Sequence, residues 1–392
     1  MTATDITAGG QHTCAVANGN VWCWGANSNG QLGDGTTSNR MAPVYVRTTD
    51  GQPLTQVSKI VAGYRHTCAL VTTTVWCWGE NSQGQLGNGG TTQSLYAVPV
   101  RTSDGDILSG VSQVSSKYNT VCVVKTGTVW CWGSTMVYPT QVLSTLLTAV
   151  SRIGVGWNSS CAVQNGYVKC WTNGQPGTLG QDSSNPNGYV VYSDGYFQSI
   201  LTGVTTLDVG GAHTCAQATV GVVCWGSNST GQLGRQINID CCSSTYAKKV
   251  SSYSAVGQIN DINTFSLGSN FTCGITGILV TCWGANSNGQ LGDGTTTSRT
   301  APVYVRTAGG QPLTQVSKIV AGYSHTCALV ETTVWCWGDN TQGQLGNGVT
   351  TQSLYAVPVR TSDGSILSGV SQVSSKYNTV CVVKTGTVWC WG

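Results

Sequence analysis

Short strand-like runs of apolar and polar residues recur along the chain, and segments rich in Gly, Asn, Ser and Thr separate them. The first such runs occupy Val21–Gly25, Ala42–Arg47 and Val57–Val61. Alternation with a period of two places successive side chains on opposite faces of a strand. The intervening residue types are those that favour tight turns. The pattern therefore predicts an all-β protein.

The runs belong to a longer repeat. The first cysteines of eight similar segments are 54, 54, 39, 54, 58, 54 and 54 residues apart. A period near fifty with four strand-like runs is typical of a β-propeller blade. We expect a single array over residues 1–392, whose hairpin units lie near residues 6–60, 61–113, 114–152, 153–206, 207–264, 265–319, 320–372 and 373–392. The first hairpin has no Val-x-x-Ile run before it, so we expect it to lack an inner strand.

Cysteine spacing fixes the register of the predicted hairpins. If Asn18-Gly19 forms a two-residue loop, Cys14 faces Cys23 in a non-hydrogen-bonded pair, with Cα atoms roughly 4.5 Å apart. A disulfide tolerates that separation. The same nine-residue spacing recurs eight times and predicts the bridges Cys14–Cys23, Cys68–Cys77, Cys122–Cys131, Cys161–Cys170, Cys215–Cys224, Cys273–Cys282, Cys327–Cys336 and Cys381–Cys390.

Two further cysteines, Cys241 and Cys242, are adjacent in the sequence. They bridge either each other or other chains, and a free thiol is the least expected outcome.

The sequence has no close Cys-x-x-Cys pair of the kind that binds zinc. We therefore expect no metal site and no cofactor. Cysteine usage of this kind predicts an extracellular or cell-surface protein. The N-terminal residues 1–5 have no signal-peptide pattern, so the signal has been removed or the sequence is an excerpt of a longer chain.

Composition and charge exclude several classes of function. A net charge of +3 over 392 residues gives no basic surface for nucleic acid. No apolar stretch is long enough to span a membrane. No phosphate loop, Gly-x-Ser-x-Gly or His-Glu-x-x-His motif is present. The four histidines occupy the same position in four separate repeats, so we do not expect them to gather in one catalytic site: His12, His66, His213 and His325. We therefore expect no catalytic residues and no enzyme activity.

One motif, Trp-Gly-x-Asn-x-x-Gly-Gln-Leu-Gly, occurs at Trp24–Gly33, Trp78–Gly87, Trp225–Gly234, Trp283–Gly292 and Trp337–Gly346. With the Gly-x-x-His-x-Cys lead-in before each histidine, it resembles the regulator of chromosome condensation repeats, in their bacterial, extracellular and disulfide-stapled form. The resemblance implies a seven-bladed β-propeller and structural histidines bonded to the blade backbone. The third unit lacks the motif after Gly133, and the fourth keeps only a decayed form at Gly174–Gly180. Because there are eight hairpins, the propeller has either seven or eight blades. Its ring is closed, open or part of a longer array.

Residues 26–133 recur as residues 285–392, with 11 of 108 positions changed. Near-identical repeats favour head-to-tail assembly. We therefore expect a non-enzymatic structural or adhesive protein that self-associates, such as a surface-fibre subunit. The alternative is a secreted propeller that binds or inhibits a protein ligand. The resemblance also implies nucleotide exchange on a small GTPase, but we expect no GTPase partner because that activity is intracellular.

Thirteen of the 14 tryptophans flank the second cysteine of a hairpin, where we expect them to form the core between blades. Trp157 is the exception. Together with the aromatic run Tyr189, Tyr192, Tyr196 and Phe197, it forms a candidate contact patch, because exposed aromatic residues anchor interfaces. The alternative interpretation of the run is an outer strand with one buried side.

Overall fold

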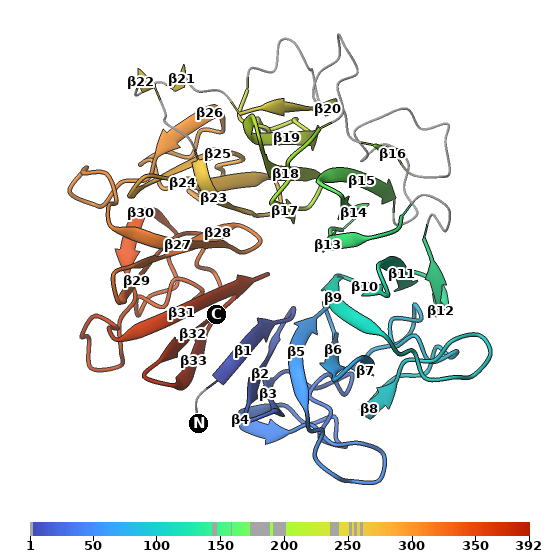
Figure 1. The fold of residues 1–392 in the computed structure, drawn as a ribbon. Coiled ribbons are helices and arrows are strands. Elements are labelled where there is room, and N and C mark those ends of the chain that lie inside the picture. The colour runs from blue at the N-terminus through green and yellow to red at the C-terminus, as the bar shows by residue number, and fades with distance from the viewer. Residues whose placement is uncertain are drawn as a thin grey trace. The chain divides into compact units, whose positions relative to one another are not determined.

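The computed structural model describes residues 3–142, 147–157, 159–172, 189–190, 201–235, 243–250, 253–254, 257–258 and 262–392. These residues form strands and turns without a helix, and no segment among them could cross a membrane as a helix. The chain divides into two compact units, Met1–Asn165 with Gly386–Val388 and Gly166–Thr385 with Trp389–Gly392. The described residues form eight blade sheets of the β-propeller type, which confirms the predicted fold class (Figure 1).

Each blade is an antiparallel sheet whose strands follow one another in sequence order. The first three blades comprise β1 (Ala3–Ala8), β2 (His12–Ala17), β3 (Asn20–Gly25) and β4 (Arg40–Tyr45); β5 (Val57–Ala62), β6 (His66–Val71), β7 (Thr74–Gly79) and β8 (Ser94–Pro99); β9 (Val111–Lys117), β10 (Thr120–Lys125), β11 (Thr128–Gly133) and β12 (Met136–Gln141). The fourth and fifth comprise β13 (Val150–Val155), β14 (Ser159–Gln164), β15 (Tyr167–Thr172) and β16 (Tyr189–Val190); β17 (Thr206–Val209), β18 (His213–Ala218), β19 (Gly221–Ser227) and β20 (Ser243–Lys249).

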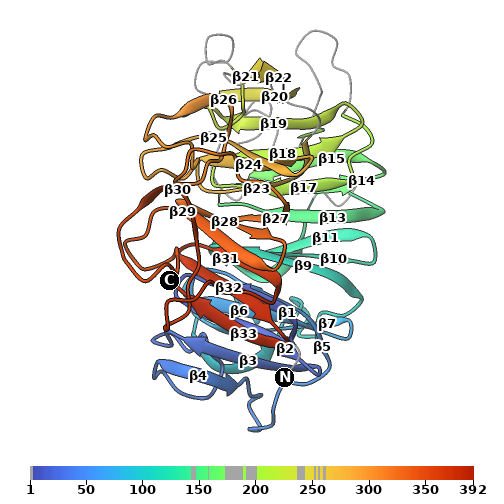
Figure 2. The same ribbon diagram turned by 90° about the vertical axis from the view of Figure 1, so that its left-hand side faces the viewer.

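The remaining blades comprise β23 (Ile262–Leu267), β24 (Phe271–Thr276), β25 (Leu279–Gly284) and β26 (Arg299–Tyr304); β27 (Val316–Ala321), β28 (His325–Val330), β29 (Thr333–Gly338) and β30 (Ser353–Pro358); β31 (Val370–Lys376), β32 (Thr379–Lys384) and β33 (Thr387–Trp391). A separate two-stranded ribbon pairs β21 (Tyr253–Ser254) with β22 (Gly257–Gln258). Figure 2 shows the strands of the blades β23–β26 and β27–β30 from the side.

The hairpin register follows the prediction. Cys14 pairs with Cys23 in β2 and β3, and their Cα atoms are 4.1 Å apart. Asn18 and Gly19 take the left-handed φ values, 50° and 73°, that this two-residue loop requires. The less favourable loops at Thr72 and Glu331 keep the same register. Disulfides close seven of the predicted hairpins, and the two cysteines of the remaining hairpin, Cys161 and Cys170, are both disulfide-bonded.

The expectation that the first hairpin lacks an inner strand is wrong. β1 pairs with β2, with Thr7 opposite Cys14. Its polar sequence is accommodated because the Asp5 carboxylate accepts hydrogen bonds from the Ile60 backbone N–H at 2.9 Å and from Lys59 Nζ at 2.8 Å. The polar face of β1 is therefore held by the neighbouring strand β5.

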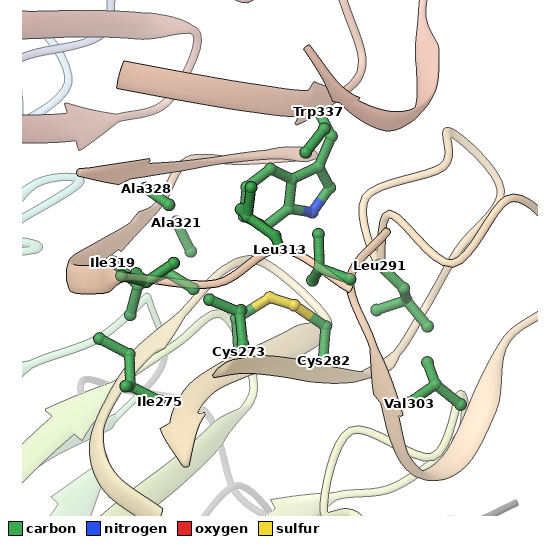
Figure 3. Packing of buried hydrophobic residues seen from close by; sticks show 14 of the residues in the cluster. Cys273, Ile275, Cys282, Leu291, Val303, Leu313, Ile319, Ala321, Ala328 and Trp337 are labelled. Atoms are coloured by element: carbon green, nitrogen blue, oxygen red, sulfur yellow. A yellow bond between two sulfur atoms is a disulfide. The ribbon is translucent and has the colours of Figure 1, made fainter. Parts of the chain in front are cut away.

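The core lies between successive blades, where the disulfide of one blade packs against a tryptophan of the next. Cys14 and Cys23 share a buried cluster with Trp78. Figure 3 shows the equivalent cluster, in which the Cys273–Cys282 bridge lies among side chains that include Ile319 and Trp337. Five of the tryptophans that follow the second cysteine are almost fully buried: Trp78, Trp132, Trp225, Trp283 and Trp337.

The tryptophans that precede the second cysteine are less buried than the sequence predicts. Trp76 is half-buried, and Trp389 is 45% exposed. Strand alternation predicts the face of these indoles correctly, and Trp76 packs against the cluster of Cys14 and Cys23, but its ring is only partly covered. The prediction of a core role for thirteen tryptophans is therefore wrong for Trp389.

Candidate binding surface

The turn between the first and second strands of a blade carries an aromatic residue in five blades. These residues occupy one repeat position, shortly after the end of the first strand: Tyr64, Tyr118, Trp157, Tyr323 and Tyr377. The first three belong to the first compact unit, and the last two belong to the second. Such turns are surface features on a rigid scaffold, which is where binding residues concentrate.

In the first compact unit the aromatic rings form a continuous row, which we call the Tyr64–Tyr118–Trp157 strip. The ring centres of Tyr64 and Tyr118 are 5.7 Å apart, and those of Tyr118 and Trp157 are 6.0 Å apart. Both pairs are tilted by 36°. The guanidinium of Arg65 lies 5.4 Å from the Tyr64 ring centre, within the range of a cation–π contact. Tyr118 is 46% exposed, so the middle of the strip faces solvent.

Backbone hydrogen bonds hold the turns of the strip to their neighbours. The Gly10 N–H donates to the Tyr64 carbonyl at 2.9 Å, and the Tyr64 N–H donates to the Tyr118 carbonyl at 3.0 Å. Tyr118 has a left-handed φ of 53°, which is unusual for a bulky side chain. Tyr377 has nearly the same φ, 51°, so this conformation belongs to the repeated turn itself. The rings are thus positioned by the fold before any ligand arrives.

The blade that carries Tyr118 has an unusually short connection between its third and fourth strands. In the first blade this connection spans residues 26–39, whereas in the third it is only Ser134-Thr135. The longer connections lie over the next blade: the Gln31 carbonyl accepts hydrogen bonds from Thr67 Oγ1 at 3.2 Å and from Trp78 Nε1 at 2.9 Å. The third blade has no connection of this length to lie over the hairpin that follows Trp157.

The second compact unit contains the duplicated form of two of these turns. Residues 370–392 are identical to residues 111–133, so Tyr377 has the same local sequence as Tyr118. Yet Tyr377 is only 9% exposed. Tyr323 corresponds to Tyr64, but Ser324 stands where the first copy has Arg65. Tyr377 and Ser324 in the duplicated segment are therefore matched controls for Tyr118 and Arg65 of the strip.

The four histidines are buried and bond to hydroxyl groups of the next blade. The partner of His12 Nε2 is Thr67 Oγ1 at 2.8 Å, and the partner of His325 Nε2 is Ser375 Oγ at 2.9 Å. His66 and His213 are bound in the same way, by Ser116 and Thr272. The structural role implied by the resemblance holds, but these bonds go to side-chain hydroxyls rather than to the backbone. Among the residues that the structure describes, no three His, Cys, Asp or Glu side chains gather into a possible metal site.

Acid should destabilise the protein through His325. Burial lowers the pKa of His325 to about 4, although the charge of Asp339 acts in the opposite direction. Below the ordinary pKa of about 6.5, the unfolded chain takes up a proton that the folded chain does not bind. The free energy of unfolding should therefore fall by up to about 1.4 kcal/mol per pH unit between pH 6.5 and 4. Chemical denaturation of wild type and His325→Gln measures this; an equally steep decline in the variant would contradict it.

The family model of the regulator of chromosome condensation (RCC1) repeat matches residues 18–70, 74–124, 280–329 and 332–383, together more than half of the chain. The chain belongs to the RCC1 repeat family. A second model of the same repeat matches residues 3–31, 57–85 and 316–344. These matches confirm that the motif identified in the sequence belongs to the regulator of chromosome condensation repeat family.

Relatives of this RCC1-repeat chain include the ultraviolet-B receptor UVR8 of Arabidopsis thaliana, which is 27% identical over 400 residues covering 99% of this chain and 76% of the receptor. The human E3 ubiquitin-protein ligase HERC2 is 24% identical over 82% of this chain, which spans only 6% of that ligase. Two solved structures share the fold. Prp20p from Saccharomyces cerevisiae has a TM-score of 0.64 at 16% identity, covering 93% of this chain and 91% of its own. Human WBSCR16 has a TM-score of 0.60 at 18% identity, covering 96% and 85%.

The structure places only part of the predicted contact patch. Trp157 lies at one end of the strip. Tyr189 begins β16 and its backbone pairs with Cys170. The remaining predicted residues lie outside the described part of the chain: Tyr192, Tyr196 and Phe197 of the patch, and Cys241 and Cys242. The sequence analysis missed Tyr64 and Tyr118, although their 54-residue spacing at a fixed distance from the first cysteine is a usable signal.

Proposed function

We propose that this RCC1-repeat chain is a non-enzymatic extracellular module that binds another protein through the Tyr64–Tyr118–Trp157 strip. The observation that carries the proposal is the row of three adjacent rings, with Tyr118 46% exposed at its centre. Tyr and Trp residues supply most of the binding energy at protein interfaces. A relative of the same fold supports a protein partner, since Prp20p has binding properties towards Gsp1p and histones.

The extracellular location is supported by the disulfides. Eight disulfide-closed hairpins persist only where the compartment is oxidising. For the same reason a small intracellular GTPase such as the Gsp1p partner of Prp20p is not part of the proposal. The non-enzymatic role is supported by the histidines, which are buried in separate blades. The ligase activity named for HERC2 is not part of the proposal, because this chain spans only 6% of that protein.

The proposal predicts that a strip variant loses the partner. The oxidised protein is immobilised, extracellular proteins from its source are passed over it, and retained proteins are quantified by mass spectrometry. A partner should be retained by the wild type and by Tyr377→Ala, but about tenfold less by Tyr118→Ala. Equal retention by all three proteins would contradict a role for the strip.

A structural or adhesive role through self-association is the second candidate. The duplicated segments, which differ at 11 of 108 positions, give one molecule two nearly identical sequences. A contact made by residues that are exposed in both copies would occur twice per chain, and two such sites permit linear assembly. Sedimentation velocity and negative-stain microscopy test this. Filaments or growth of mass with concentration support a fibre subunit, and a monomer at every concentration excludes it.

A further inference from the structure

We propose that the Tyr64–Tyr118–Trp157 strip binds an extended peptide segment with apolar or proline side chains at alternate positions and a carboxylate at its Arg65 end. The inference rests on the proposed protein-binding function and specifies its ligand. Three features of the first compact unit carry it: the spacing of the rings, the charge beside them and the exposure of Tyr118.

The ring spacing matches the repeat of an extended chain. Alternate residues of a β-strand point to the same face and lie about 6.4–6.8 Å apart, or less when the strand is twisted. Two residues of a polyproline II helix advance about 6.2 Å. The ring centres are 5.7 and 6.0 Å apart, so each ring can contact one of three alternate side chains. Aromatic-lined grooves are established docking sites for polyproline II segments, because that conformation is largely formed before binding and loses little entropy.

The residues next to Tyr64 and Tyr118 in the sequence carry positive charge, and the acid nearest in the fold, Glu80, donates its backbone N–H to the Arg65 carbonyl. Arg65 is exposed next to Tyr64, and Lys117 lies half-buried next to Tyr118. The residues that flank the two tyrosines in sequence include no acid: Gly63 and Arg65, Lys117 and Asn119. A guanidinium binds a carboxylate bidentately, which gives the peptide a direction as well as affinity. The acidic residue of the ligand therefore belongs at the Tyr64 end.

The middle ring of the strip, Tyr118, is exposed, and the connection Ser134-Thr135 in the same blade is short. Ser134 Oγ and Thr120 Oγ1 are 2.9 Å apart, which fixes this turn close to the third blade. The Thr135 N–H donates to the Gln83 carbonyl at 2.9 Å, so the turn is also anchored to the blade before it. A connection of the length seen in the first blade, residues 26–39, would instead extend over the next hairpin.

Fluorescence anisotropy with a labelled synthetic peptide tests the proposal. The probe has an aspartate followed by proline and leucine residues at alternate positions, separated by serine. We expect saturable binding that weakens about tenfold in Tyr118→Ala and is retained in Tyr118→Phe and in Tyr377→Ala. Arg65→Ser, which reproduces the duplicate residue Ser324, should weaken the aspartate peptide about threefold and leave a lysine-headed peptide unchanged.

Three results would overturn the proposal: no saturable binding, equal binding of a peptide with the same residues in blocked order, or full binding by Tyr118→Ala. Binding of a soluble oligosaccharide in place of the peptide would also overturn it, because the strip would then recognise sugar. Failure of the peptide while Tyr118→Ala still loses the native partner would reject this ligand and leave the proposed function intact. Thermal unfolding of each variant establishes that it is folded.

Discussion

Replacing Trp78 with alanine should lower the free energy of unfolding by about 3–5 kcal/mol, the usual cost of removing a large buried aromatic side chain. The Trp78 indole is completely buried and packs in the cluster that contains Cys14 and Cys23 of the preceding blade. Its Nε1–H also donates to the Gln31 carbonyl at 2.9 Å. The substitution therefore leaves a cavity between two blades and removes one of the two side-chain hydrogen bonds that the Gln31 carbonyl accepts.

Trp76→Ala is the matched control, because Trp76 lies two residues away on the same strand but is half-buried. Its indole donates to Thr74 Oγ1 at 3.3 Å within the same strand rather than to another blade. We expect a loss of about 1–2 kcal/mol there, since less apolar surface is uncovered. Trp337→Ala should reproduce the large effect, because Trp337 makes the same bond to the Gln290 carbonyl. Chemical denaturation measures all three, and equal losses for Trp76→Ala and Trp78→Ala would contradict the packing account.

Full reduction of the disulfides should unfold the chain. Each bridge closes a loop of about ten residues and contributes roughly 2–3 kcal/mol in the chain-entropy model. Eight such contributions are on the order of 20 kcal/mol, more than the net stability of about 5–15 kcal/mol that is usual for folded proteins. Reduced protein should consequently fail to regain its β-sheet circular dichroism when denaturant is diluted out in the presence of a phosphine reductant. The oxidised protein should regain it.

Removing one bridge by mutation distinguishes the stabilising effect of the disulfides from general damage by the reductant. The double variant Cys122→Ala and Cys131→Ala should remain folded and lose about 2–3 kcal/mol, because the other hairpins stay closed. Non-reducing peptide mapping of the wild type should link cysteines within hairpins only. Recovery of the full sheet signal after complete reduction would show that the bridges are dispensable for the fold.

The hairpins could be predicted from the sequence because their determinants are local. The Asn18-Gly19 loop and the spacing of Cys14 and Cys23 define a register without reference to the rest of the chain. β1 was not predicted, since its residues lack the apolar pattern of the other inner strands. Its position depends on the Asp5 carboxylate and the Ile60 N–H, which are 55 residues apart.

The exposure of the candidate site could not be predicted from local sequence. Tyr118 and Tyr377 lie in identical segments of 23 residues, yet one is 46% exposed and the other 9%. The difference must come from the surroundings that each turn meets, because the blades themselves have the same sequence there. In the same way, the contact of Tyr64 with Tyr118 arises from the packing of successive blades and not from any motif.

The central claim is that the chain binds a protein through the Tyr64–Tyr118–Trp157 strip, and site-specific photocrosslinking tests it most directly. A photoreactive benzoylphenylalanine is placed at position 118 in one sample and at the duplicate position 377 in another. Each oxidised protein is irradiated with extracellular proteins from its source. The account predicts a discrete protein adduct at position 118 and none at position 377. The absence of an adduct at position 118, or the same adduct at both positions, would contradict it.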